Sequence, residues 1–200
     1  MSSPSAIIHR RMIRHYTDQP VAAQTVSEML DAARRAPSPH NRQPWRFAVI
    51  RDEQRARLAH VMGEQLRADS LRDGIPADAI ERDAQRSIKR ITSAPVCIVA
   101  CMSMREMDTY PDVRRSEAER WMAGQAVAAA VQNILLRATE LGLGACWMCA
   151  PLFCPQEVVQ SLSLPADWEP QALLTIGYPA EMGKDRTRKS LDEITIYRYG

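Results

Sequence analysis

Hydrophobic and polar residues follow two different periods along this chain, and the periods predict a mixture of helices and strands. Apolar residues recur every three or four positions in some segments, as in amphipathic helices, while short continuous apolar runs are typical of buried strands. We expect helices at 21–36, 52–68, 77–92, 116–141 and 156–162. We expect strands at 45–50, 96–102, 145–148 and 172–178. Several connections are too short or too polar for a regular doubly wound sheet. The pattern therefore favours an α+β sandwich, a sheet with helices on both sides.

The longest predicted helix has an alanine-rich middle, residues 123–130, that is nearly apolar all round. A helix without a polar face usually lies in the centre of a core or in an interface. Gly142 follows it and is expected to end the helix in the left-handed conformation. Taken alone, this helix also fits a plain helical interaction module, which would bind no chromophore.

Composition narrows the classes of protein to which the chain can belong. Its 200 residues suit one domain over 1–200, and the hydrophobic fraction of 46% supports a core. A formal net charge of +2 predicts no strong attraction to nucleic acid or to a membrane. No apolar run approaches a membrane span, and the first residues lack the apolar core of a signal peptide. Five cysteines, an odd number, favour reduced thiols in the cytoplasm over a disulfide framework.

Residues 36–47, Ala-Pro-Ser-Pro-His-Asn-Arg-Gln-Pro-Trp-Arg-Phe, form the most informative stretch of the chain. Three prolines exclude a helix interior, yet the segment joins a predicted helix to a predicted strand. Ser38, Asn41 and Gln43 place hydroxyl and amide groups on this stiff backbone, as a binding site requires. The alternative is an ordinary helix-to-strand turn, because turns are rich in the same residues.

Basic residues gather near both ends of the chain. The first cluster contains Arg10, Arg11 and Arg14, and the second contains Lys184, Arg186, Arg188 and Lys189. Each guanidinium offers a rigid fork of donors that matches a phosphate group. The two clusters could close on a single phosphate, whereas the alternative is that both are solvated basic surface.

Other chemistries find little support in the sequence. The pair Cys146 and Cys149 lacks the second pair that a zinc site needs and lies in a strand-like run, so we expect buried structural thiols. Gly142 and Gly144 begin a dinucleotide fingerprint, but Trp147 occupies its third glycine position, and no P-loop occurs. The histidines show no metal-ligand spacing, and no hydrolase triad can be argued. We therefore predict no metal site.

Taken in order, these motifs resemble the FMN-dependent nitroreductase family over nearly the whole chain. Residues 10–14 resemble its Arg-Arg-Ser-x-Arg opening, and residues 36–47 resemble its Ala-Pro-Ser-x-x-Asn-x-Gln-Pro-Trp-x-Phe motif. Residues 132–136, 142–147, 176–179 and 186–188 complete the series. Three positions depart from the family pattern, with Met12 in place of serine, Cys149 where relatives often have glycine, and Pro39 as an additional proline.

The resemblance implies a three-layer α+β sandwich with a central, mostly antiparallel sheet, assembled as a domain-swapped type of homodimer. It implies FMN as the cofactor, bound at two sites in the subunit interface, with the arginines on the phosphate. Because the flavin itself carries the hydride, no catalytic acid or base is expected. The cofactor-binding residues that it implies are Arg10, Arg11, Arg14, Pro37, Ser38, Asn41, Gln43, Trp147, Met148, Cys149, Arg186 and Arg188.

A narrower resemblance covers residues 71–176. Segments 74–82, 110–112 and 164–170 resemble the C-terminal reductase domain of bifunctional proteins that build the deazaflavin coenzyme F-420. This implies reduction of the enolpyruvyl double bond of dehydro-F-420, with Tyr110, Arg114 and Arg115 on the small-molecule substrate. The alternatives are a general NAD(P)H-dependent nitro or quinone reductase and a non-catalytic flavin or deazaflavin binding protein. A flavin-consuming dimethylbenzimidazole synthase shares the Arg-Arg-x-x-Arg start, but Asn41 fits the reductase loop better.

Overall fold

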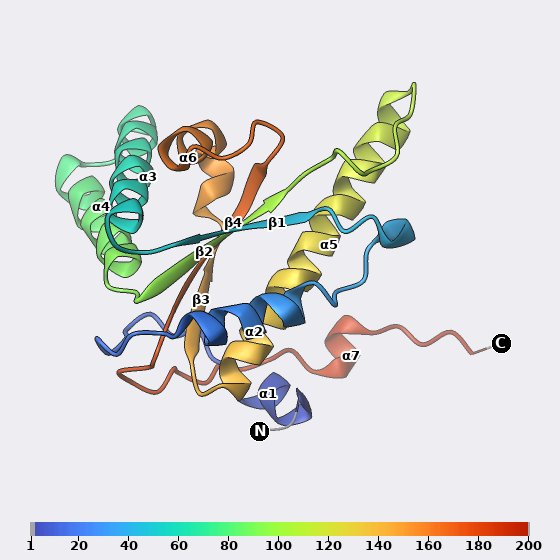
Figure 1. Cartoon of the computed structure of the whole chain (residues 1–200), viewed down its shortest axis with the longest axis horizontal. Coiled ribbons are helices and arrows are strands. Elements are labelled where there is room, and N and C mark those ends of the chain that lie inside the picture. The colour runs from blue at the N-terminus through green and yellow to red at the C-terminus, as the bar shows by residue number, and fades with distance from the viewer. Residues whose placement is uncertain (1–2, 200) are drawn as a thin grey trace.

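A four-stranded sheet lies at the centre of the computed structural model, which describes residues 3–199 (Figure 1). The strands are β1 (Trp45–Ile50), β2 (Val96–Met102), β3 (Gly144–Met148) and β4 (Glu169–Gly177). Their order across the sheet is β1-β2-β4-β3, and each neighbouring pair is antiparallel. The antiparallel sheet expected from the sequence is confirmed.

Helices cover both faces of this sheet (Figure 1). Helices α2 (Ala23–Ala33) and α5 (Val113–Glu140) contribute to the hydrophobic core on one face. Helices α3 (Asp52–Arg72), α4 (Ala77–Thr92) and α6 (Pro155–Leu162) contribute to the core on the other face. The three layers of the predicted α+β sandwich are therefore present.

Strand β2 joins the two cores because every one of its residues is buried. Val96, Ile98 and Ala100 belong to the core under α2 and α5, whereas Cys97 and Val99 belong to the opposite core. This alternation follows from the two-residue period of a strand. It explains why the sequence of β2 is an uninterrupted apolar run.

Four short helical elements complete the fold of residues 3–199: α1 (Ser3–His9), η1 (Pro39–Asn41), η2 (Ala150–Phe153) and α7 (Leu191–Ile194). Helix α1 lies near the start of the chain, where no element was predicted. Helix α7 interrupts the tail that was expected to be merely polar and basic. Its start is fixed by a capping box, in which the Ser190 hydroxyl accepts from the backbone N–H of Glu193 and the Glu193 carboxylate accepts from that of Ser190.

Several predicted boundaries differ from the structure, among them the end of α3, which extends to Arg72 instead of residue 68. Three of the differences have an identifiable reason. Helix α2 ends at Ala33 rather than at residue 36, because the residue before Pro37 is driven out of the helical region. Helix α5 begins three residues early, since the Asp112 carboxylate accepts from the backbone N–H of Arg115 as an N-cap. Strand β4 includes Pro170, which lies opposite Cys101 where the register with β2 shifts, a place where proline is tolerated.

The end of α5 agrees with the sequence. Gly142 follows the helix with a φ of +75°, the left-handed conformation expected of the glycine that ends a helix. Between residues 3 and 199, no helix combines the length and the apolar character that crossing a membrane demands.

Candidate functional site

The first basic cluster lies on a segment, residues 10–17, that runs between the edge strand β3 and the chain after β4. The backbone N–H of Ile13 donates to the carbonyl of Ala145 on β3 over 3.1 Å. On its other side, the N–H of Ala180 donates to the carbonyl of His15 over 3.0 Å. These bonds hold a segment from the start of the chain against one from near its end.

Tyr16 fastens this segment to the sheet. Its hydroxyl lies 2.7 Å from the carbonyl oxygen of Ile13 and 2.8 Å from both the carbonyl oxygen and Oγ1 of Thr175. Burial raises the pKa of Tyr16 far above its ordinary value, so the hydroxyl stays protonated. A neutral hydroxyl can donate to one carbonyl and accept from Thr175, which satisfies it within the fold.

Two glycines allow the backbones to approach closely here. A Cβ added to Gly144 would lie 2.6 Å from the Cβ of Ile13, and one added to Gly183 would lie 2.5 Å from the Cβ of Arg11. Both distances are shorter than any ordinary contact between carbon atoms. The absence of side chains therefore lets the 10–14 segment lie close to β3 at Gly144 and close to the 181–184 segment at Gly183.

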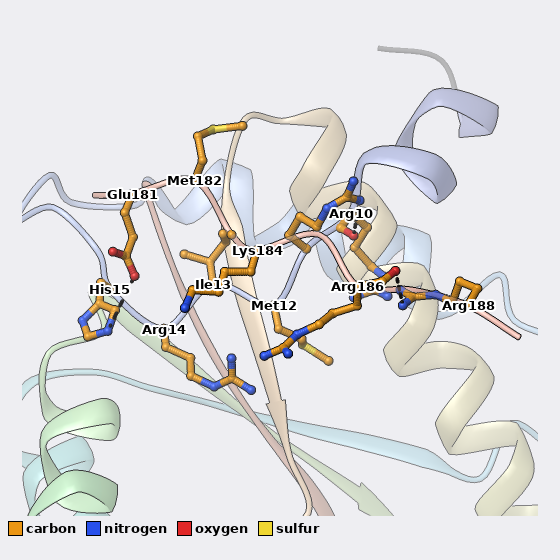
Figure 2. Close-up of a pocket in the computed structure, with 12 residues that line it drawn as sticks. Arg10, Met12, Ile13, Arg14, His15, Glu181, Met182, Lys184, Arg186 and Arg188 are labelled. Atoms are coloured by element: carbon orange, nitrogen blue, oxygen red, sulfur yellow. Dashed lines mark hydrogen bonds and ion pairs between the residues drawn. The ribbon is translucent and has the colours of Figure 1, made fainter.

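A cavity of about 370 Å³ opens where the two segments meet (Figure 2). Arg14 and Arg186 extend their guanidinium groups toward the same space, whereas Met182 points away from it (Figure 2). The cavity is lined by Arg10, Arg11, Met12, Ile13, Arg14, His15, Glu181, Met182, Gly183, Lys184, Arg186 and Arg188. The structure thus brings together all five arginines that the sequence singled out near the two ends of the chain.

The charges of this basic cavity are only partly compensated. Arg11 forms an ion pair with Asp185 at 3.0 Å, and His15 Nε2 lies 3.7 Å from a carboxylate oxygen of Glu181. Among residues 3–199, none of the remaining arginine and lysine side chains of the cavity has a carboxylate within 4.0 Å; these are Arg10, Arg14, Lys184, Arg186 and Arg188. A cluster of this kind favours the binding of an anion such as a phosphate.

The proline-rich loop between α2 and β1 has an unusual backbone. His40, Asn41 and Gln43 have φ values of +45°, +56° and +51°, in the left-handed region that residues other than glycine seldom adopt. The backbone N–H of Gln43 donates to the hydroxyl of Ser38 over 3.0 Å, and the Arg46 guanidinium donates to the Gln43 carbonyl, also over 3.0 Å. Such conformations each cost about 1–3 kcal/mol and concentrate at functional sites.

The third predicted group lies where β3 ends. Trp147 packs against the core, and its indole Nε1 is buried without a hydrogen-bond partner in the described part of the chain. Cys146 is buried, and burial raises the pKa of its thiol. Cys149, in contrast, is exposed, which corrects the expectation of two buried thiols. The cause is its position after β3, where Cys149 caps η2 as the chain leaves the sheet.

The predicted substrate residues lie at the start of α5. The Arg115 guanidinium stands 4.9 Å above the centre of the Tyr110 ring and donates to the carboxylate of Asp112. Arg115 is thus already engaged by Tyr110 and Asp112, while Arg114 is exposed. None of these residues, and none of the proline-rich loop, lines the basic cavity of the same chain.

Sequence reasoning missed part of the cavity wall. Ile13, His15, Glu181, Met182 and Gly183 line it, although neither their types nor their spacing suggest a ligand. The pairing of the chain around Tyr16 with the chain around Pro179 brings them together, and no local pattern predicts such a distant bridge. No group of three metal-ligating side chains occurs within residues 3–199.

The chain was compared with known proteins. The family model described as "Nitroreductase family" matches residues 7–178. The NADH dehydrogenase of Thermus thermophilus is 29% identical, with 99% of this chain and 97% of that protein covered. The 5,6-dimethylbenzimidazole synthase of Rhodospirillum rubrum is also 29% identical, with 86% of this chain and 79% of the synthase covered.

A crystal structure of similar fold comes from Desulfovibrio desulfuricans. That protein is described as a nitroreductase in complex with FMN. It is 30% identical to this chain, with a TM-score of 0.76, and the match covers 100% of this chain and 98% of the Desulfovibrio desulfuricans chain. The fold, the order of the motifs and the match of the family model over residues 7–178 agree. The chain belongs to the nitroreductase family.

Proposed function

We propose that this protein is an FMN-dependent oxidoreductase that acts on a small molecule, with the FMN phosphate held in the basic cavity. The observation that carries the proposal is the meeting of two distant basic clusters in one cavity, where five cationic side chains lack a carboxylate partner among residues 3–199. Membership of the nitroreductase family supports the same conclusion, as does the FMN complex of the relative from Desulfovibrio desulfuricans.

The residues present fit this cofactor. Arg14 and Arg186 would hold the phosphate with forked donors, and the buried Nε1 of Trp147 offers a donor that lacks an acceptor within the described chain. Bound FMN supplies hydride and electron transfer, so the protein has only to bind, orient and tune it. Accordingly, we assign no catalytic acid or base to any side chain.

We further propose a homodimer with sites at the subunit interface. The proline-rich loop does not line the basic cavity of its own chain, although its amides suit the polar edge of a flavin. Contribution of Pro37, Ser38, Asn41 and Gln43 to the site of a second copy would resolve this separation. The five cysteines are all free, which suits the reducing conditions of the cytoplasm that we propose as its location.

Absorption spectroscopy is the first test. The purified protein should show flavin bands after addition of FMN, and these should bleach with NADH or NADPH, because the Thermus thermophilus relative is an NADH dehydrogenase. Absence of retained FMN would refute the proposal. Retained FMN that no donor reduces would instead indicate a binding protein without catalysis.

For the substrate, we propose dehydro-F-420, on the similarity of segments 74–82, 110–112 and 164–170 to the deazaflavin reductase domain. Tyr110, Arg114 and Arg115 would then meet its carboxylate and phosphodiester groups. Turnover of dehydro-F-420 should exceed turnover of a nitroaromatic or a quinone. The reverse order of rates would identify a general NAD(P)H-dependent reductase.

A second function is favoured by one specific comparison. The 5,6-dimethylbenzimidazole synthase from Rhodospirillum rubrum is 29% identical over 180 residues. If this chain shares that activity, reduced FMN exposed to oxygen will lose its colour irreversibly, and a benzimidazole product will appear in mass spectra. Reoxidation with full recovery of the flavin spectrum would exclude the synthase and leave the reductase.

A further inference from the structure

The proline-rich loop is tied to another loop that is distant in sequence. The Arg42 guanidinium donates to the carboxylate of Asp108 over 2.5 Å, across 66 residues of sequence. A second link joins the backbones, as the N–H of Ser103 donates to the carbonyl of Pro44 over 2.9 Å. These two contacts connect the loop before β1 to the loop that follows β2.

Asp108 is itself held from the interior of the protein. Its backbone N–H donates over 3.2 Å to the carboxylate of Glu119, a residue of α5 that is only 2% exposed. A buried carboxylate destabilises the fold unless it is hydrogen-bonded. The folded state therefore favours the contact between Glu119 and Asp108. The path therefore runs from the long helix through Glu119 and Asp108 to Arg42.

Arg42 occupies a distinctive place in the backbone. It stands between Asn41 and Gln43, both of which have positive φ values. Residues in such conformations persist only where the surroundings hold them. The ion pair with Asp108 restrains the one residue that separates the two amide side chains.

We propose that Asp108 is a positioning residue, which acts through Arg42 to hold Asn41 and Gln43 in the conformation in which their amides meet the flavin. This inference rests on the proposed function, because it assumes that the loop faces FMN. Asp108 would not touch the cofactor. Removing its charge would free Arg42 and let the strained backbone relax, and the amides would then leave the polar edge of the flavin.

The test compares Asp108→Asn and Asp108→Glu with the wild-type holoenzyme. Asp78→Asn is the matched control, since Asp78 pairs with Arg82 on the exposed face of α4 and its amide variant removes one surface ion pair of the same kind. FMN affinity is measured from the quenching of flavin fluorescence, and the midpoint potential is measured against a reference dye. Urea unfolding of each protein reports stability.

We expect Asp108→Asn to weaken FMN binding about 5-fold or more and to shift the midpoint potential. Asp108→Glu should restore both values in large part, while Asp78→Asn should leave them at the wild-type level. If Asp108→Asn fails to fold, Arg42→Gln tests the same pair from its other side and should give the same two changes.

Three results would overturn the inference. A wild-type protein that takes up no FMN would refute the proposed function and this inference together. A wild type that binds FMN, with variants at positions 108 and 42 that match it in affinity and potential, would refute the positioning role alone. A loss of stability without a change in either flavin property would do the same.

Discussion

At the scale of single residues, the basic cavity contains arginines that differ in what already holds them. Arg11 has its carboxylate partner in Asp185, and Arg188 donates to the carbonyl of Arg186 over 3.1 Å. The guanidinium of Arg186 has no carboxylate within 4.0 Å in the described chain, and it extends into the cavity (Figure 2). The charge of Arg186 is thus available to an anion, and this residue is the one to test.

Replacement of Arg186 by alanine should weaken FMN binding by about 10-fold or more, because a charge-assisted hydrogen bond to phosphate contributes about 1.5–3 kcal/mol. The affinity is measured by fluorescence titration at low and at high salt. Lys189→Ala is the control, since Lys189 belongs to the same basic tail but does not line the cavity. Equal effects of the two variants would mean that the tail acts only through its general charge.

The Tyr16 hydroxyl predicts a stability effect. Tyr16→Phe should lower the free energy of unfolding by about 1–3 kcal/mol, because it leaves the buried groups of Thr175 and Ile13 without their partner. Urea unfolding measures the change. Tyr199→Phe, at a position that is 86% exposed, should change stability little. Comparable losses in the two variants would contradict the anchoring role of Tyr16.

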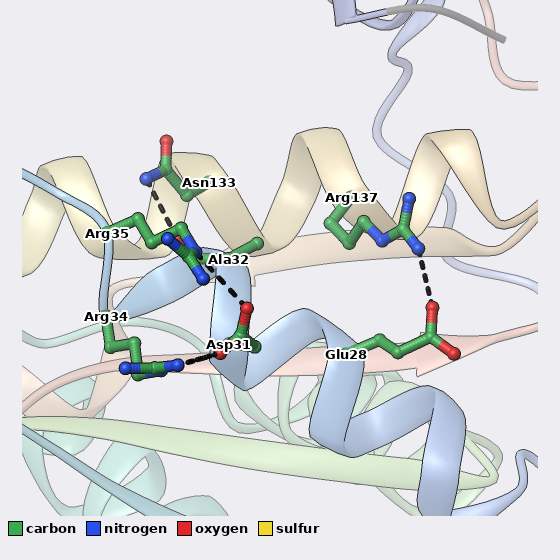
Figure 3. A network of polar contacts seen from close by, with 7 residues as sticks. All are labelled: Glu28, Asp31, Ala32, Arg34, Arg35, Asn133 and Arg137. Atoms are coloured by element: carbon green, nitrogen blue, oxygen red, sulfur yellow. Dashed lines mark hydrogen bonds and ion pairs between the residues drawn. The ribbon is translucent and has the colours of Figure 1, made fainter.

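At the scale of elements, polar contacts fasten α2 to α5 in two ways (Figure 3). The Asn133 side-chain amide donates to the carbonyl of Ala32, the second last residue of α2, over 3.0 Å. One helical turn further along α5, the Arg137 guanidinium pairs with Glu28. The first contact involves neutral groups and the second involves charges. Salt should therefore weaken the contribution of the second contact to stability and leave that of the first unchanged.

Asn133→Ala should destabilise the protein by about 1–2 kcal/mol, whatever the salt concentration. Glu28→Gln should cost at most about 1 kcal/mol at low salt and less at high salt, because its ion pair is partly exposed. Unfolding in urea at two salt concentrations measures both. A strong salt dependence in the cost of Asn133→Ala would contradict this division.

The pairing of α3 with α4 predicts a dependence on pH. The Arg67 guanidinium donates to both carboxylate oxygens of Glu81 and lowers the pKa of that group from 4.5 to about 2. A carboxyl whose pKa is lower in the folded state stabilises the fold above its unfolded pKa, and this contribution disappears as the pH falls toward the folded pKa. Glu81→Gln should therefore flatten the loss of stability between about pH 4.5 and pH 2. An unchanged slope of stability against pH in this window would refute the contribution of the Arg67–Glu81 pair.

The elements that the sequence predicted well are those whose burial is repeated along the chain. The apolar run of β2 is buried as its pattern indicates. The alanine-rich middle of α5 is buried on one side only, at Ala123, Ala126, Val127 and Ala130, while Gln125 is exposed. One error arises where a tertiary contact overrides local preference. Pro170 would end a strand in most contexts, and only the shifted register opposite Cys101 accommodates it in β4. Helix α7 was missed although its capping box, Ser190 and Glu193, can be found in the sequence.

At the scale of the whole molecule, the sequence predicts those parts of the site whose charged residues lie close together along the chain. The arginines near both ends of the chain could be identified because each cluster is local in sequence, and because the forked donors of a guanidinium group match a phosphate. The remaining wall of the cavity depends on pairing between residues near 16 and residues near 179, which no local pattern predicts. In the proposed homodimer, the relation of the proline-rich loop to the basic cavity would depend on a second copy of the chain, which local sequence patterns do not describe.

The C-terminal segment gives the last prediction. It extends away from the body of the molecule (Figure 1), and it carries exposed apolar side chains at Ile194, Ile196, Tyr197 and Tyr199. Apolar residues gathered on one segment are costly in water unless they are covered, and the proposed homodimer offers a second copy to cover them.

The double substitution Ile194→Asp and Ile196→Asp should therefore shift the protein from dimer toward monomer in analytical ultracentrifugation. Leu71→Asp, at a similarly exposed position on α3, is the control and should leave the assembly unchanged. The dimer should also lose FMN as it dissociates, since the proline-rich loop of each proposed site comes from the partner. A monomeric wild type that binds FMN at full affinity would contradict both the assembly and the shared site.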